Sequence, residues 1–233
     1  METRYPPPWY RLLEQSHKKN HRNVAFVQMT NLRRNGQPSL HNIRFLDFLK
    51  DDPRYLLFSM AFNDHNLHGD IKSNPNAQLN WQMPISKEIY NFSGRFYITS
   101  SQNKITRFPA PKIILDEPNN ISPREYWESL RCQLWNSLSS QSRATFTWPP
   151  SGEIPKSDKD SFKCFKLDSM LNSTNSVNSS EKILHDLAFE NFCILIFKAN
   201  EAMRFDYEAF PPKRIVYNFD DEENVWEVEE ANP

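Results

Sequence analysis

Glycine is scarce in this chain, with only 4 among 233 residues. Loops that cradle a phosphate need glycine, because their backbone must approach the ligand closely and adopt positive φ angles. The glycine-rich nucleotide motifs are therefore absent. Charge is nearly balanced, with 28 basic and 29 acidic residues, and no stripe of basic and aromatic residues is visible. Nucleic acid is thus not expected as a partner.

Cysteine is also rare: Cys132, Cys164 and Cys193 form no Cys-x-x-Cys pair. This pattern fits neither a disulfide framework nor a tetrahedral zinc site. The longest apolar run, Phe192 to Phe197, is too short to span a bilayer, and prolines precede Trp9 where a secretory signal needs an apolar segment. We therefore expect a cytoplasmic or nuclear protein with no membrane partner and no metal site.

A period of two dominates the first hundred residues. Between 77 and 83, apolar residues alternate with Gln78, Asn80 and Gln82, and the same alternation continues over 89–100. Such a period predicts strands buried on one face. Further strands are predicted at 24–30, 38–49 and 55–60, and Asn35-Gly36 is typical of a tight hairpin turn between the first two.

Helices are predicted in three places: after the proline run from Trp9, over 64–74, and from the capping box Ser122-Pro123-Arg124-Glu125. The stretch 149–184 is rich in Ser, Asn and Lys, and we interpret it as a loop insertion with a disordered centre at 172–180. Strands at 192–198, 203–210, 213–219 and 225–228 close the chain. The order favours a single domain, 1–233, that is mainly β with peripheral helices, in the form of an antiparallel barrel.

Several short segments occur in an order that resembles the pyridoxamine 5'-phosphate oxidase-like family of FMN-binding split-barrel proteins, in the branch that ends in Asn-Pro. The resemblance implies an FMN-binding split β-barrel of antiparallel Greek-key type. It also implies a homodimer with FMN, or another small molecule, at the subunit interface. The segments are Pro8-Trp9, His41 to Phe48, Asn74-Pro75, Trp81 through Ser93-Gly94-Arg95, Tyr126-Trp127, Phe146 to Pro149, Phe192 to Leu195, Arg214 and Asn232-Pro233.

The resemblance also implies where the flavin contacts fall. His41 stands where relatives have a phosphate-binding Arg, and His65-Asn66-Leu67 stands where they have Ser-Arg-Lys; an alternative register places Asn63-Asp64 there. Neither register supplies a Lys or Arg. A Gln that contacts the flavin ring in relatives becomes Ile89, whereas a ring-contacting Arg is retained. The implied cofactor-binding residues are His41, Ile43, Arg44, Ser59, Asn63, His65, Asn66 and Arg214.

The substrate-binding Arg-x-His pair of the relatives has no match, because Phe210-Pro211-Pro212 occupies that region. Loss of two basic phosphate contacts would lower the affinity for FMN by a factor of about 10² to 10⁴ if the effects add. We therefore expect a protein with a degenerate flavin site and no pyridoxamine phosphate oxidase activity, and identify no catalytic residue. The alternative is an active FMN-dependent oxidoreductase with an altered phosphate site.

Two histidine assignments stay open at this point. His41 shares a strand face with Ile43 and Phe45, so it is either a phosphate ligand or a half-buried histidine with an internal partner. His65 and His68 have a spacing that can hold a metal, but no carboxylate or Cys completes the set, so a solvated helix face is favoured.

Overall fold

The computed structural model describes residues 6–20, 24–101, 104, 111, 122–154, 162, 164–169 and 179–233. The chain divides into two compact units. The first comprises residues 1–58, 70–96 and 196–233, and the second comprises 59–69 and 97–195. The single-domain organisation stays a prediction.

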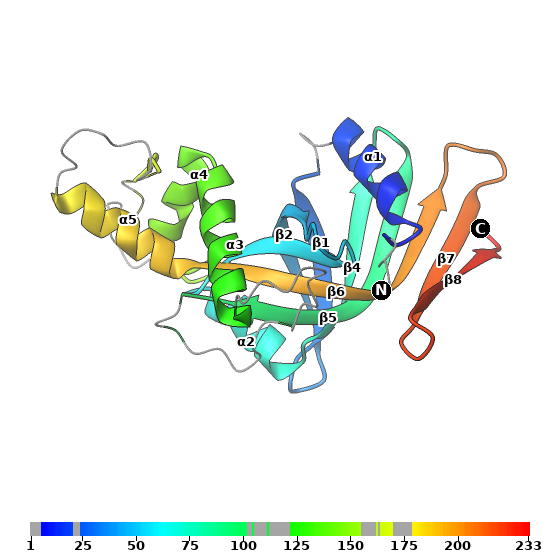
Figure 1. Ribbon diagram of the computed structural model, residues 1–233, viewed down its shortest axis with the longest axis horizontal. Helices are drawn as coiled ribbons and strands as arrows, with labels where there is room; N and C mark the ends of the chain where they lie inside the picture. The colour runs from blue at the N-terminus through cyan, green and yellow to red at the C-terminus, as the bar shows by residue number, and fades with distance from the viewer. Residues whose placement is uncertain are drawn as a thin grey trace. The chain divides into compact units, whose positions relative to one another are not determined.

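The strands form one sheet in the order β3-β2-β1-β4-β5-β6-β7-β8. An additional β3–β6 pairing closes the first six strands into an antiparallel barrel, and β7 and β8 continue from β6 as a hairpin (Figure 1). The mainly β fold class expected from the sequence is confirmed. The strand bounds are β1 (Phe26–Leu32), β2 (Pro38–Phe48), β3 (Tyr55–Ala61), β4 (Asn76–Met83), β5 (Glu88–Thr99), β6 (Phe192–Asp206), β7 (Lys213–Asp220) and β8 (Val225–Ala231).

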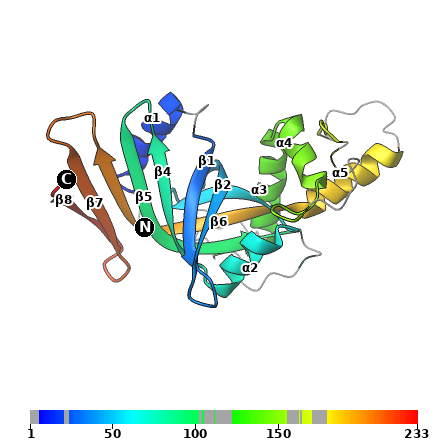
Figure 2. The same ribbon diagram turned by 180° about the vertical axis from the view of Figure 1, so that it is seen from behind.

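The alternating strands are where the sequence pattern places them. In β4 the burial pattern alternates along the whole strand, with Leu79 and Trp81 inside the barrel and Gln78 outside. The β1–β2 hairpin turns at Gly36, whose φ of 78° is a left-handed conformation that favours glycine. Figure 2 shows β1, β4 and β5 side by side, so their outward side chains form one continuous face.

Helices flank the strands. The capping box predicted at Ser122 is present, since its Oγ accepts from the Glu125 amide at 3.3 Å and Glu125 Oε2 accepts from the Ser122 amide at 2.9 Å. No helix among the described residues is long and apolar enough to cross a membrane. The helices are α1 (Tyr10–Asn20), α2 (His65–Ser73), α3 (Pro123–Ser137), α4 (Ser140–Ala144), the 3-10 turn η1 (Thr145–Thr147) and α5 (Ser179–Asn191).

In the second unit, α3 and α5 are joined by a buried guanidinium. Arg131, on α3, donates to the Phe189 carbonyl at 2.7 Å and to the Phe192 carbonyl at 3.2 Å, and its charge is balanced by Glu128 at 2.7 Å. The last carbonyls of a helix lack partners within the helix. Arg131 supplies a donor to the Phe189 carbonyl in the last turn of α5 and also donates to the Phe192 carbonyl at the start of β6, so this buried charge has a structural role.

Two local predictions need correction. The strands expected at 192–198 and 203–210 are one long strand, β6, and Phe210 lies beyond it, 98% exposed. Helix α5 was not predicted, and it begins at Ser179, inside the stretch expected to be disordered; residues 172–178 lie outside the described residues. The loop insertion expected at 149–184 stays a prediction, and Leu167 within it is buried.

Candidate functional site

The position that the sequence assigned to the flavin phosphate contains an internal ion-pair cluster. His41 Nε2 lies 2.8 Å from Asp70 Oδ2, and Arg33 Nε donates to the same oxygen at 3.2 Å. The side chains of His41 and Asp70 are 16% and 14% exposed, so most of the pair is shielded from water. Of the two interpretations of His41, the structure supports a half-buried histidine with an internal partner.

Asp70 is held in place by its backbone as well as by its side chain. Asn31, which faces inward on β1, donates from Nδ2 to the Asp70 carbonyl at 3.0 Å and to the Asn74 carbonyl at 2.8 Å. The Asn31 amide oxygen in turn accepts from Ser39 Oγ. Burial raises the pKa of the Asp70 carboxyl, but the hydrogen bonds from His41 and Arg33 outweigh it and hold the pKa below its ordinary value. Asp70 is therefore an anion near neutral pH.

The start of α2 is capped by another carboxylate. Asp64 Oδ1 accepts from the Leu67 amide at 3.1 Å, which occupies one of the donors that a helix N-terminus otherwise offers to an anion. Leu67 is only 5% exposed and belongs to the core, whereas His65 and Asn66 are exposed. Neither register considered for this segment puts a Lys or Arg side chain here.

Asn63 and Ser59 lie in the second unit with different surroundings. The Asn63 amide nitrogen donates to Asn191 Oδ1 at 3.0 Å, its Oδ1 accepts from Asn191 Nδ2 at 3.1 Å, and its Nδ2 donates to the Trp148 carbonyl at 3.3 Å. These bonds fasten the end of β3 to the end of α5, so Asn63 has a structural role. Ser59 is half-buried on β3.

The remaining assigned positions on the barrel divide between inside and outside. Ile43 is 1% exposed and packs in the core, as the alternation on β2 predicts. Arg44 points the other way, half-exposed, and pairs in register with Phe26. Ile89 is half-buried on β5 opposite Gln82.

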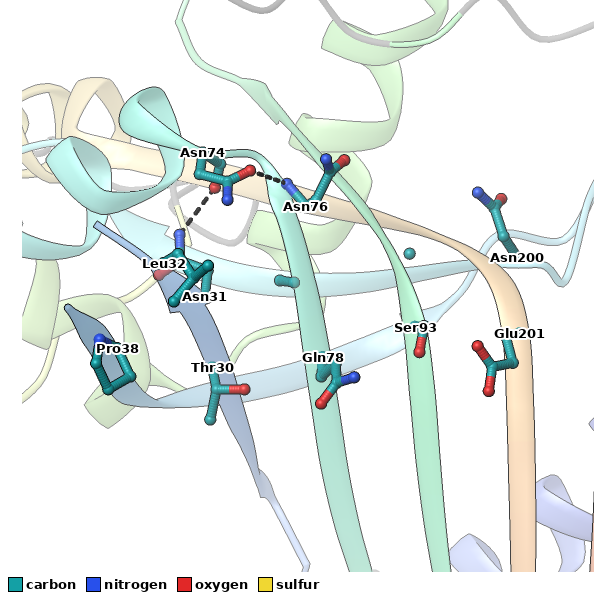
Figure 3. A pocket seen from close by; sticks show the side chains of 12 residues that line it. Thr30, Asn31, Leu32, Pro38, Asn74, Asn76, Gln78, Ser93, Asn200 and Glu201 are labelled. Atoms are coloured by element: carbon teal, nitrogen blue, oxygen red, sulfur yellow. Dashed lines mark hydrogen bonds between the residues drawn. The ribbon is translucent and has the colours of Figure 1, made fainter. Parts of the chain in front are cut away.

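A polar groove crosses the outer face of the first unit. Thr30, Gln78, Ser93 and Glu201 come from four neighbouring strands, and their side chains point to the same side (Figure 3). Two adjoining hollows of about 550 Å³ each share these four residues. Hydroxyl, amide and carboxylate groups provide both donors and acceptors along the groove, so it suits a polar ligand or a wet protein interface.

Arg214 lines one end of this groove. It lies on β7 opposite Phe205, and its guanidinium carbon is 5.4 Å from the centroid of that ring. Its Nε is buried without a hydrogen-bond partner among the described residues. An unsatisfied buried donor is costly, so Arg214 is the assigned cofactor residue whose surroundings favour an additional ligand.

Sequence reasoning missed Asp70 and Arg33, which define the surroundings of His41. They lie 29 and 8 residues from His41 in the chain, and no short motif links them. The sequence did indicate the outward polar residues of the groove, because Gln78 and Asn80 alternate with buried apolar residues on β4. Among the described residues no group of three or more His, Cys, Asp or Glu side chains is placed to hold a metal ion.

The arrangement described so far is a closed six-stranded antiparallel barrel with a hairpin extension and peripheral helices. Two solved structures share it across nearly the whole chain. A pyridoxamine 5'-phosphate oxidase-related, FMN-binding protein from Nostoc punctiforme PCC 73102 matches with a TM-score of 0.73 and 20% identity, over 98% of this chain and 100% of that chain. PhzG from Burkholderia lata 383, in complex with tetrahydrophenazine-1-carboxylic acid, matches with a TM-score of 0.63 and 13% identity, over 100% and 95%.

This likeness shows that the chain has the fold of the pyridoxamine 5'-phosphate oxidase-related, FMN-binding split-barrel proteins, as the sequence resemblance predicted. No family model and no curated protein matches the sequence.

Proposed function

We propose that this chain is a split-barrel protein with a degenerate flavin site that does not oxidise pyridoxamine phosphate. One observation carries the proposal: Asp70 Oδ2 lies 2.8 Å from His41 Nε2. The sequence resemblance places the flavin phosphate at His41. A carboxylate at that position occupies the histidine donor and repels a phosphate dianion.

The positions that the resemblance assigns to the flavin phosphate do not fit that group. His41 is bonded to Asp70, and Asp64 caps α2 where relatives provide basic side chains. The exposed residues at the helix start, His65 and Asn66, include no permanent cation. Phe210, in the segment that replaces the substrate-binding Arg-x-His, extends into solvent. The same fold can therefore carry a different site chemistry, as is common among proteins that share a fold.

A second candidate function is an FMN-dependent oxidoreductase with an altered phosphate site. Arg214 favours it, because its Nε is buried without a partner at the edge of a groove large enough for a ring system. Bound FMN would distinguish the two functions, since a purified flavoprotein is visibly yellow.

Titration of FMN, followed by quenching of its fluorescence, tests the proposal. We expect the wild type to bind FMN no tighter than tens of micromolar and the double variant His41→Arg, Asp70→Asn to bind at least tenfold tighter. Arginine restores a bidentate phosphate contact that histidine cannot make. If a second cation is added to this variant, it should replace Asn66 rather than Leu67, because a lysine at the buried position 67 would disrupt the core.

A matched control, Asn42→Arg with Asp47→Asn, makes the same change of charge at exposed positions of β2. It should leave FMN affinity unchanged. Submicromolar binding by the wild type would refute the proposed function, and equal affinities of the two double variants would show that position 41 is not the phosphate position.

We also propose a homodimer located in the cytoplasm or nucleus. Exposed apolar side chains on the outer face of β1 and β2 support self-association, with Phe26 61%, Leu40 63% and Leu32 52% exposed. Free Cys132, Cys164 and Cys193 fit a reducing compartment. Sedimentation that shows only monomers at micromolar concentration would contradict the dimer.

A further inference from the structure

We propose that Arg33 and His41 form an anion-binding site whose present occupant is the carboxylate of Asp70. The ligand class is a phosphate dianion, either inorganic or as a monoester. This inference rests on the proposed function and deepens it, because it makes Asp70 an internal competitor at the site where the proposed function places the lost phosphate contact.

The geometry of the two donors carries the inference. Arg33 Nε comes from the start of the β1–β2 turn and His41 Nε2 comes from the inner face of β2, and both converge on a single oxygen, Asp70 Oδ2, at 3.2 and 2.8 Å. Convergent N–H donors, one of them the guanidinium of an arginine, are a usual means of binding an oxyanion. Here an internal carboxylate takes the position of the oxyanion.

The framework of the site does not depend on the Asp70 carboxylate. The Asp70 carbonyl is bonded to Asn31 Nδ2, and Asn31 is fixed by Ser39. The turn that carries Arg33 is closed by its own bonds, from the Arg33 amide to the Gln37 carbonyl at 2.8 Å and from the Gly36 amide to the Arg33 carbonyl at 2.9 Å. Removal of the carboxylate charge should therefore leave both donors near their present positions.

Charge selects phosphate over a simple carboxylate. The Arg33 side chain is 45% exposed, so a ligand can reach its guanidinium from solvent. Asp70 offers one oxygen to both donors, whereas a phosphate dianion offers a separate oxygen to each and carries a larger charge. Phosphate is thus expected to bind more tightly than acetate once Asp70 no longer competes.

The experiment compares inorganic phosphate binding by the wild type and by Asp70→Asn in the full chain. Calorimetric titration gives the affinity, and the ring resonances of His41, assigned with His41→Gln, report binding at the site. We expect Asp70→Asn to bind phosphate at least tenfold more tightly than the wild type, which corresponds to about 1.4 kcal/mol. Acetate should bind to Asp70→Asn more weakly than phosphate does. The gain in phosphate affinity over the wild type should diminish at high salt.

Two further variants locate the site. Adding Arg33→Gln or His41→Gln to Asp70→Asn should abolish the gain, and Asp47→Asn, which removes a carboxylate from an exposed position on β2, should not produce it. If Asp70→Asn unfolds the protein, Asp70→Ser provides the same test with a smaller side chain.

The inference is overturned if the variants at Asp70 bind phosphate no better than the wild type, or if the gain survives the loss of Arg33. A phosphomonoester without a flavin ring, such as glycerol phosphate, should follow inorganic phosphate. The outcome is independent of FMN: tight FMN binding by the wild type would refute the proposed function alone, and failure of phosphate to bind the Asp70 variants would refute this inference alone.

Discussion

Replacement of Glu88 by Gln should destabilise the first unit more than any comparable change of an exposed carboxylate. Glu88 begins β5 and is 5% exposed. Its Oε1 accepts from the Arg204 guanidinium at 2.6 Å and from the Tyr90 hydroxyl at 3.3 Å, and its Oε2 accepts from Ser16 Oγ on α1. One carboxylate therefore ties α1, β5 and β6 together.

The expected loss of stability depends on the partners that Arg204 keeps in the variant. Breaking a buried ion pair by removing one partner costs about 3–5 kcal/mol. Arg204 retains a bond to Asp206 at 3.0 Å, and its side chain is 17% exposed. Glutamine also preserves the volume of Glu88 and an acceptor for Ser16. Because of this compensation we expect a loss near the lower end of the range, about 3 kcal/mol.

Urea unfolding measures this loss as a change in midpoint at constant slope. Glu201→Gln, an exposed carboxylate on β6, serves as the control and should change stability by less than about 0.5 kcal/mol. In a double-mutant cycle, Arg204→Met combined with Glu88→Gln should cost less than the sum of the single changes. A loss below about 1 kcal/mol for Glu88→Gln would refute the view that this network is a desolvated ion pair.

Two other changes test the packing and the titration of the same unit. A Cβ at Gly94 would collide with the Lys198 carbonyl oxygen, so Gly94→Ala should lower the free energy of unfolding by about 1–3 kcal/mol. Gly69 has open space around it, so Gly69→Ala should be harmless and serves as the control. Equal melting temperatures of the two variants would contradict the close approach at Gly94. Burial raises the pKa of the Tyr90 hydroxyl above its ordinary value of 10.0, so the fold favours the protonated form. The resulting stability is complete below pH 10 and declines as the pH rises towards the folded-state pKa. Unfolding free energies between pH 8 and 11 should decline less in Tyr90→Phe, and an unchanged slope would show that other groups, such as Tyr217, dominate.

The parts of the fold that the sequence predicts are those encoded by near neighbours. The alternation around Leu79 and Trp81 depends only on the pleat of one strand, and the hairpin depends on the positive φ of Gly36. The capping box at Ser122 depends on a residue three positions away. Each signal is complete within a few residues, so each appears in the sequence without knowledge of the rest of the chain.

Where prediction was wrong, distant contacts outweighed local composition. Asn200-Glu201 looks like a break between strands, yet both residues continue β6, where the chain passes from the barrel to the hairpin with β7. The start of α5 is rich in serine, but its later residues pack on α3 through Trp135 and Arg131. Tertiary contacts here decide what propensity leaves open.

The candidate site shows the same difference between what near neighbours encode and what distant contacts decide. The inward direction of His41 follows from the alternation of β2, but its partner lies on α2, 29 residues along the chain. The resemblance implies that His41 replaces a phosphate-binding arginine of the relatives, but the sequence does not reveal that the Asp70 carboxylate lies beside His41. That difference changes the function expected of the protein, because a site that lacks one cation still attracts phosphate weakly, whereas a site that contains Asp70 must lose its own anion before it binds another.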